Sequence, residues 1–162
     1  MIIGHLPAGY LAATGALDRL RVTPRQGRAL LATALVASIA PDIDLVYFYT
    51  LGGDAHHHAY PTHWPSAWLV VTALGIGVAW SRRSRFGALL AAFAGAGGLL
   101  HLVLDSIAGR VRWGAPFSAR ETTLVVVPDS SAHWMVDMAT HWTFGAEVAL
   151  VALAAVVWWR RR

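Results

Sequence analysis

Five apolar stretches, each close to the length of a membrane-crossing helix, constrain this chain more than any other feature. They cover residues 1–17, 29–51, 64–80, 86–104 and 142–159. A helix needs about 20 residues to cross the hydrocarbon core of a bilayer, with about 17 as a lower limit. The third and fourth stretches contain no acidic residue, lysine or arginine, and the third begins and ends on tryptophan, which favours membrane interfaces. The pattern predicts an all-α, polytopic membrane bundle of about five helices with four to five spans.

The composition agrees with a bilayer as the solvent. Charged residues make up 14% of the 162-residue chain, whereas about 25% is usual in soluble domains. Little chain is left for a separate soluble module, so we expect one domain over residues 1–162. The formal charge of +4 comes from clustered arginines and does not indicate a nucleic-acid partner. Cysteine is absent, so any metal must be held by nitrogen and oxygen ligands.

The arginines are distributed unevenly among the connections between the apolar stretches. Ten of the 13 fall within residues 18–28, 82–85 and 160–162, which share one side of the membrane if all five stretches cross it. Arginine-rich connections stay in the cytoplasm. The histidines and all acidic residues but Asp18 then lie at or near the outer face. We therefore predict a multi-pass protein of a bacterial-type inner membrane, with a site that faces the periplasm and a cytoplasmic C-terminus.

A histidine and a carboxylate end the fourth apolar stretch, in the sequence His101-Leu-Val-Leu-Asp105. The spacing of four places both side chains on one helix face, about one turn apart, where they can reach one ion. A single buried hydrogen bond between the two would explain the same spacing. The position at a membrane boundary favours a functional role, because ionisable groups there are energetically costly.

Two acidic residues end the second stretch, in the sequence Pro41-Asp42-Ile43-Asp44. A spacing of two places them on nearly opposite helix faces unless the proline breaks the helix, which leaves open which of the two is the direct ligand. A helix end that meets headgroup water is the simpler interpretation. Carboxylates at a helix C-terminus oppose the macrodipole, however, and a bound cation would reverse that penalty.

The densest histidine cluster lies in the first outer connection, where residues 56–63 include His57, His58 and His63. Neutral imidazole is the commonest protein ligand for zinc and similar metals, so the cluster indicates a metal site. A solvated polar loop is the alternative, and we expect it to apply to one or two members such as His56.

The second outer connection repeats the pattern, with His133, Asp137 and His141 each four residues apart. On a helix this spacing would align the three side chains on one face as a second half-site. The alternative is an ordinary loop, because the segment is helical only by assumption.

Taken in order, several of these elements resemble the YdjM-like family of inner-membrane metal-dependent hydrolases. The resemblance covers about the first 120 residues. It rests on His5, residues 41–44, His58 and His63 with Thr62 between them, residues 101–105, and Pro116-Phe117-Ser118. The family's His-Arg-Gly-x-Thr-His-Ser element reads His58-Ala-Tyr-Pro-Thr-His63-Trp here, which keeps both histidines and the threonine and lacks the arginine, glycine and serine. The ligand order is more distantly similar to zinc-dependent phospholipase C.

The resemblance implies a metal-dependent hydrolase with one to three divalent ions, zinc first and manganese or magnesium as alternatives. With Asp44 bridging, the expected ligands are His5, Asp42, Asp44, His58, His63, His101 and Asp105. Additional candidate ligands are His57, His133, Asp137 and His141. Asp42 or Asp137 would act as general base or orient a ligand. The expected substrate is a phosphoester of a lipid or lipid-linked molecule, its phosphate held by Arg110, Arg112 and Arg120.

Two other functions fit the same residues. One is a non-enzymatic protein that binds or transports divalent metal, although transporters usually place their ligands near the membrane midplane rather than at one face. The other is a zinc-dependent amide hydrolase that acts on a lipid. A serine nucleophile is not indicated, because the chain has no G-x-S-x-G sequence.

Overall fold

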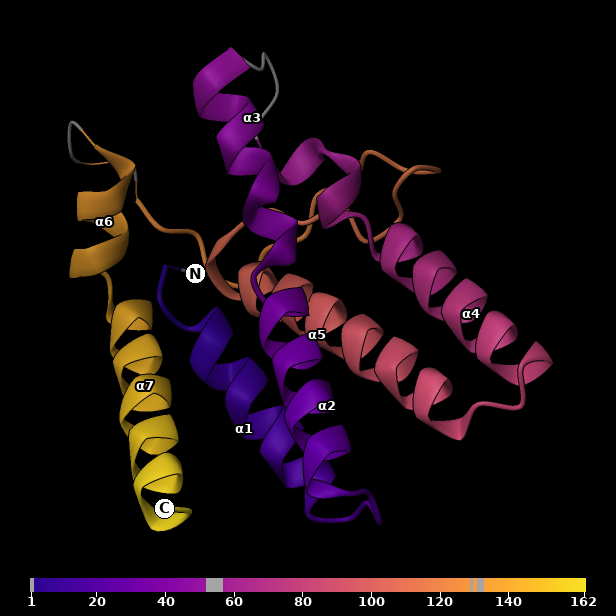
Figure 1. Ribbon diagram of the computed structural model, residues 1–162. Helices are drawn as coiled ribbons and strands as arrows, with labels where there is room; N and C mark the ends of the chain where they lie inside the picture. Colours follow the sequence, from indigo (N-terminus) through magenta and orange to yellow (C-terminus); the bar gives the residue numbers. More distant parts are fainter. Residues whose placement is uncertain (1, 52–56, 129, 131–132) are drawn as a thin grey trace.

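The computed structural model describes residues 2–51, 57–128, 130 and 133–162, which fold into a helical bundle (Figure 1). Its α-helices are α1 (His5–Leu17), α2 (Pro24–Ala37), α3 (Asp44–Leu51), α4 (Pro65–Ser81), α5 (Arg85–Ala108), α6 (Trp134–Thr140) and α7 (Trp142–Arg160). Three short 3-10 helices are η1 (Ala40–Ile43), η2 (His57–Ala59) and η3 (Pro61–His63). Within these ranges the extended pairing is limited to one bridge between Val111 and Thr122. The predicted all-α class is confirmed.

The helices differ in their ability to cross a membrane. With 24 and 19 residues, α5 and α7 are long and apolar enough to do so. A third crossing arises if α2 and the segment Ala40–Leu51, which are bent by 51° relative to each other, form one broken span. The 17 residues of α4 and the 13 of α1 fall short of the same length criterion. The described residues therefore provide two to three candidate spans, fewer than the four to five expected from apolar length.

The second apolar stretch is not one helix. Its first helix, α2, ends at Ala37, because Pro41 lacks the N–H that would donate to the Ala37 carbonyl. The chain then forms η1 and restarts as α3. The expectation that both acidic residues end one apolar helix is wrong, since Asp42 lies in η1 and Asp44 begins α3. At a helix N-terminus the Asp44 carboxylate is stabilised by the macrodipole rather than opposed by it.

Helix α5 lies at the centre of the bundle, where it packs against α4, α2 and α1. Two glycines allow the close approach. A Cβ added to Gly98 would collide with the Trp68 ring of α4, and one added to Gly97 would lie 2.8 Å from the Ala34 carbonyl of α2. Small residues of this kind bring helices together in lipid, where no hydrophobic force drives them. The packing brings the C-terminal end of α5 close to the end of α2 and the start of α4.

The outer faces of α4 and α7 are apolar and exposed. On α4, Leu69, Val71 and Leu74 are each more than half exposed, and on α7 Leu153 and Trp159 are as well. Exposed apolar side chains on one helix face are unfavourable in water and favourable in hydrocarbon. These faces are therefore suited to contact lipid.

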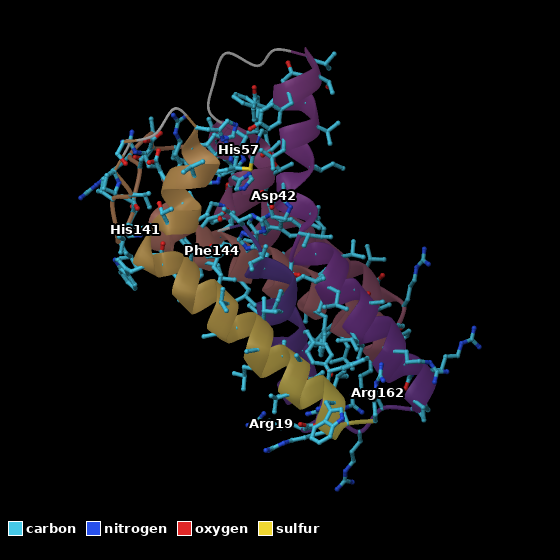
Figure 2. All side chains as sticks on the ribbon, turned by 90° about the vertical axis from the view of Figure 1, so that its left-hand side faces the viewer. Arg19, Asp42, His57, His141, Phe144 and Arg162 are labelled. Carbon is cyan, nitrogen blue, oxygen red and sulfur yellow. The ribbon has the colours of Figure 1, made fainter. Side chains whose placement is uncertain are left out.

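The arginine-rich segments gather at one end of the bundle and the site residues at the other. Figure 2 shows Arg19 and Arg162 at the arginine-rich end and Asp42 and His57 at the opposite end. The loops 18–23 and 82–84 and the C-terminus all lie at the arginine-rich end (Figure 1). The arginine-rich segments and these residues thus lie at opposite ends of the described bundle, and the side of the membrane that each end faces stays a prediction.

The carboxylate of Glu147 connects α7 to the N-terminal segment. Its Oε2 accepts hydrogen bonds from the backbone N–H groups of Ile2, Ile3 and Gly4, at 2.8, 2.6 and 2.9 Å. The Glu147 residue is 1% exposed. Since His5 follows directly, these bonds set where α1 begins and where its first side chain lies.

Candidate metal centre

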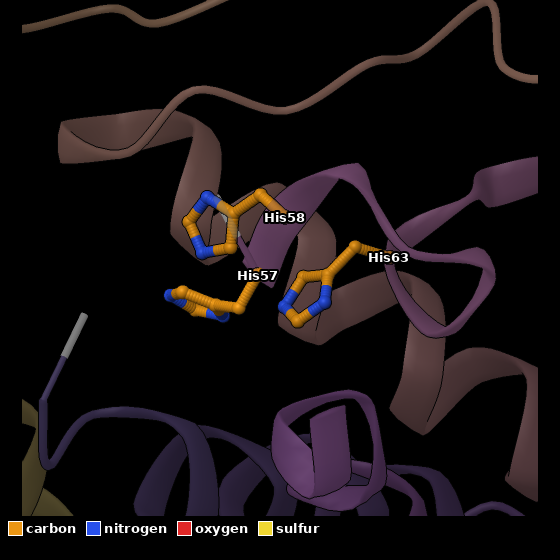
Figure 3. Close-up of side chains that lie close together, drawn as sticks. All are labelled: His57, His58 and His63. Atoms are coloured by element: carbon orange, nitrogen blue, oxygen red, sulfur yellow. The ribbon is translucent and has the colours of Figure 1, made fainter. Parts of the chain in front are cut away.

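Side chains from five separate elements meet at the end of the bundle opposite the arginines. His5 begins α1, Asp42 lies in η1, and His101 and Asp105 lie on the last turns of α5. His57, His58 and His63 come from η2 and η3, and Figure 3 shows their three rings gathered together. The rings of His5 and His101 stack with their centroids 3.8 Å apart. The residues of this centre therefore span a hundred positions of sequence.

The carboxylate of Asp105 lies at the middle of the centre, 1% exposed. Its Oδ1 is 3.1 Å from His5 Nε2. Its Oδ2 is 3.0 Å from His101 Nε2, 3.4 Å from His58 Nε2 and 3.5 Å from His63 Nε2. Four imidazoles thus present the same nitrogen to one carboxylate.

The second nitrogen of three of these rings is held by a hydrogen-bond acceptor. Nδ1 of His101 lies 2.8 Å from the Ser38 carbonyl, and Nδ1 of His58 lies 3.2 Å from the Arg110 carbonyl. A carbonyl oxygen can only accept, so Nδ1 carries the hydrogen and, in the neutral ring, Nε2 carries the lone pair. Such partners fix the orientation and tautomer of histidines that bind metals.

The third ring is held by a carboxylate. Nδ1 of His63 donates to Oδ2 of Asp44 at 2.6 Å, and the same oxygen accepts from Thr62 Oγ1 at 2.5 Å. The other oxygen of Asp44 lies 3.4 Å from Nδ1 of His57. Asp44 therefore lies behind the His63 ring, on the side away from Asp105. In this arrangement Asp44 orients the His63 ring. Its role as a bridging ligand stays a prediction.

Several polar atoms of the centre are buried without a hydrogen bond from the described part of the chain. They include Nε2 of His63, Nε2 of His101 and Oδ1 of Asp44. Asp42 Oδ1 faces the first two atoms at 3.8 and 3.5 Å. Unpaired nitrogen lone pairs that face carboxylate oxygens in a buried site are energetically unfavourable, and a cation between them would remove the cost.

The geometry fits two overlapping sets of ligands. Asp42, His63, His101 and Asp105 each offer an atom within 4.8 Å of all the others, and His57, His58 and His63 do the same. Nitrogen and oxygen atoms in sets of three or four are the ligands of zinc sites in proteins. Burial disfavours the charged form of His63, yet the carboxylates of Asp105 and Asp44 outweigh burial and raise the pKa of His63 above its usual value. The same negative field attracts a metal ion.

The second outer connection does not form the predicted helix of stacked ligands. Among the described residues of this connection, only Trp134–Thr140 is an α-helix. His133 and His141 flank this helix, and their Nδ1 atoms accept from the backbone N–H groups of Met135 and Thr143. The expectation that His133, Asp137 and His141 share one helix face is wrong, because the histidines lie outside the helix. Asp137 accepts from the Ser130 hydroxyl at 2.8 Å. None of the three belongs to either ligand set found among the described residues.

The three arginines predicted to hold phosphate differ in their surroundings. Arg112 pairs with Glu121 at 3.0 Å. Arg110 and Arg120 are exposed and form no ion pair within the described ranges. The Arg110 backbone carbonyl holds His58, so the arginine-bearing connection lies directly against the centre.

Sequence reasoning assigned no role to Glu147 or Ser38. Glu147 is a carboxylate inside an apolar stretch, a position that indicates function by default and was the available signal. Ser38 contributes only its backbone carbonyl, which no side-chain pattern can reveal.

The Gly109→Ala variant is expected to weaken metal binding about tenfold, a loss typical of disturbing the support of a ligand. A Cβ on Gly109 would lie 2.7 Å from Cε1 of His58, so the ring must shift. Titration of the purified protein with zinc against a chelating dye measures the effect. Gly77→Ala, whose new Cβ meets nothing within 4 Å, is the matched control. Wild-type affinity in the Gly109 variant would show that His58 does not contact the ion.

These features define a class, a helical membrane protein with a buried histidine–aspartate centre at one end of its bundle. The chain belongs to the YdjM inner membrane protein family, whose family model matches residues 1–162. The family resemblance is confirmed and extends over the whole chain, and it agrees with the predicted inner-membrane location. Neither the comparison with curated proteins nor that with solved structures found a match. The likeness to zinc-dependent phospholipase C stays a prediction.

Proposed function

We propose that this protein is a membrane-embedded metal-dependent hydrolase that cleaves a phosphoester of a lipid or lipid-linked substrate. One observation carries the proposal, the convergence of four imidazole Nε2 atoms on the Asp105 carboxylate. A purely structural role would be met by one histidine bonded to the carboxylate. Four imidazoles and a second carboxylate exceed that need and match the ligand number of a metal centre.

Asp42, His63, His101 and Asp105 would hold one divalent ion, with zinc as the first choice and manganese or magnesium as alternatives. His57 and His58, with His63, would hold a second. When bound, such an ion would polarise the scissile bond and lower the pKa of a water molecule to about 7. Asp44 orients His63, and the Ser38 carbonyl orients His101.

Asp42 is the ligand-set member most open to solvent. Its side chain is 31% exposed, whereas those of His63, His101 and Asp105 are 2% exposed or less. A general base must reach the proton that it removes, so Asp42 is better placed for this role than Asp137. Arg110 and Arg120 would bind the substrate phosphate.

The arrangement in the membrane is also part of the proposal. The short helices α1 and α4 would cross with α5, α7 and the bent pair, giving up to five spans. The arginine-rich end would face the cytoplasm and the centre the periplasm, by the positive-inside rule. A centre at the headgroup level favours a lipid substrate, because the reacting group need not leave the membrane.

Metal analysis of detergent-purified protein tests the centre. The wild type is expected to contain about one or more equivalents of zinc, and the His101→Ala and His58→Ala variants much less, because direct ligands are lost. His133→Ala is the control, since this histidine lies outside both ligand sets. Equal metal content in all four proteins, or near-zero content in the wild type, would contradict the centre.

Hydrolysis of a lipid panel tests the reaction. Release of phosphate or a phosphorylated headgroup by the metal-loaded wild type, and its loss in Asp42→Asn, would support the proposal. Release of a fatty acid from an amide lipid would instead identify an amide hydrolase. Metal uptake into vesicles without any hydrolysis would identify a transport protein.

A further inference from the structure

The connection between α4 and α5 borders a cavity of about 380 Å³ at the arginine-rich end, far from the metal centre. Its wall is apolar and is formed by Ile76, Ala79 and Ala88. Its other lining residues are Trp80, Arg83, Ser84 and Arg85. None of the described residues that line it is acidic. The cavity therefore combines a mostly apolar surface with two arginines among its lining residues.

The arginines of this cavity have no protein counter-charge in the described structure. Asp18 is the acidic residue of this end, and both of its oxygens are taken by Arg161, at 3.0 and 2.6 Å. Arg83 and Arg85 form no ion pair with any described residue. Both arginines are exposed, so their charges are available to an anion from outside the chain.

The backbone adds to the positive potential. Arg83 has a φ of 50°, a left-handed conformation that costs energy for a residue with a Cβ and turns the chain sharply into α5. Ser84 then caps α5 by accepting from the Gly87 N–H at 3.0 Å. The first residues of a 24-residue helix thus lie at the cavity, and its N-terminus carries the positive end of the macrodipole.

The apolar wall of the cavity indicates a ligand with a hydrocarbon chain as well as a negative charge. Trp80 is 83% exposed and Ile76 37%, and both continue the lipid-facing surface of α4. Exposed tryptophan is typical of the level where headgroups meet acyl chains. We propose that this cavity binds an anionic phospholipid of the leaflet at the arginine-rich end, with its phosphate between Arg83 and Arg85 and an acyl chain along Ile76 and Trp80. Basic pockets between membrane helices bind anionic headgroups by the same chemistry.

Thermal unfolding of the detergent-purified protein tests the proposal, with dioleoylphosphatidylglycerol, dioleoylphosphatidylcholine or inorganic phosphate added. Phosphatidylglycerol alone is expected to raise the unfolding midpoint of the wild type. The Arg83→Gln/Arg85→Gln variant should need about tenfold more of this lipid for the same rise. Arg25→Gln/Arg28→Gln removes the same charge from the first turns of α2 at this end and should respond like the wild type.

A second variant tests the cavity itself. Ala88→Leu keeps both arginines and fills the apolar wall, so it should also weaken the response to phosphatidylglycerol. An equal response in all variants would overturn the proposal. If inorganic phosphate raised the unfolding midpoint as much as phosphatidylglycerol does, the cavity would bind a simple anion, and the proposal of a lipid ligand would be wrong. The outcome does not depend on whether the metal centre hydrolyses a lipid.

Discussion

The Asp105→Asn variant is expected to bind zinc at least about 100-fold more weakly than the wild type. Changing a residue that only orients a ligand costs about 10- to 100-fold, and a shared ligand should cost more. Among the carboxylates that the structure describes, Asp105 is the one that faces His5, His58, His63 and His101 together. Asparagine has nearly the same shape as aspartate but lacks the negative charge that offsets the cost of burying a cation. Competition with a chelating dye measures the affinity.

Two measurements separate loss of the ion from loss of the fold. The metal-free Asp105→Asn protein should still unfold in one cooperative transition, with a midpoint somewhat below that of the metal-free wild type, because it lacks the carboxylate charge that raises the pKa of His63. Asp18→Asn makes the same chemical change at the arginine-rich end, where the carboxylate is exposed, and should bind zinc normally. If Asp105→Asn retained wild-type affinity, Asp105 would not be the shared ligand.

The Glu147→Ala variant is expected to lose about 3 kcal/mol of unfolding free energy, because hydrogen bonds to a buried charged group contribute about 1.5–3 kcal/mol each and their loss is only partly compensated by water. Three backbone N–H groups lose their acceptor, and Gly4 among them is buried. Since His5 follows Gly4, zinc affinity should fall as well. Thermal unfolding and zinc titration measure the two effects.

Controls show whether Glu147 acts through the N-terminal segment. Glu121→Ala removes an exposed carboxylate paired with Arg112 and should change stability by less than about 1 kcal/mol. In a His5→Ala background, Glu147→Ala should cause no further loss of zinc affinity, because the ring that it positions is already absent. A further loss in that background would mean that Glu147 supports the centre by another route.

The spacing of residues along one helix correctly predicted that two side chains of this centre lie close together. His101 and Asp105 are four apart on α5 and do face the same point, since a long regular helix enforces that geometry. The arginine pattern likewise predicted which ends of the helices lie together. Both inferences depend on features that tertiary packing leaves unchanged.

Other parts could not be read from the sequence. The loop histidines His57, His58 and His63 have no fixed direction until η2 and η3 form against α5, so their two ligand sets appear only in three dimensions. The spacing of His133 and His141 predicted a helix that side-chain capping interrupts. Asp44 pairs with Nδ1 of His63 rather than facing Asp105, a distinction that residue type alone does not carry.

The bond between Glu147 and the first residues has a consequence for biogenesis. A ribosome makes the chain in the N-to-C direction, so His5 is synthesised well before Glu147. His58, His63, His101 and Asp105 can gather once α5 is inserted, but the first turn of α1 gains its anchor only when α7 enters the bilayer. Full assembly of the centre therefore waits for the insertion of α7, and a nascent protein truncated before α7 should capture metal poorly.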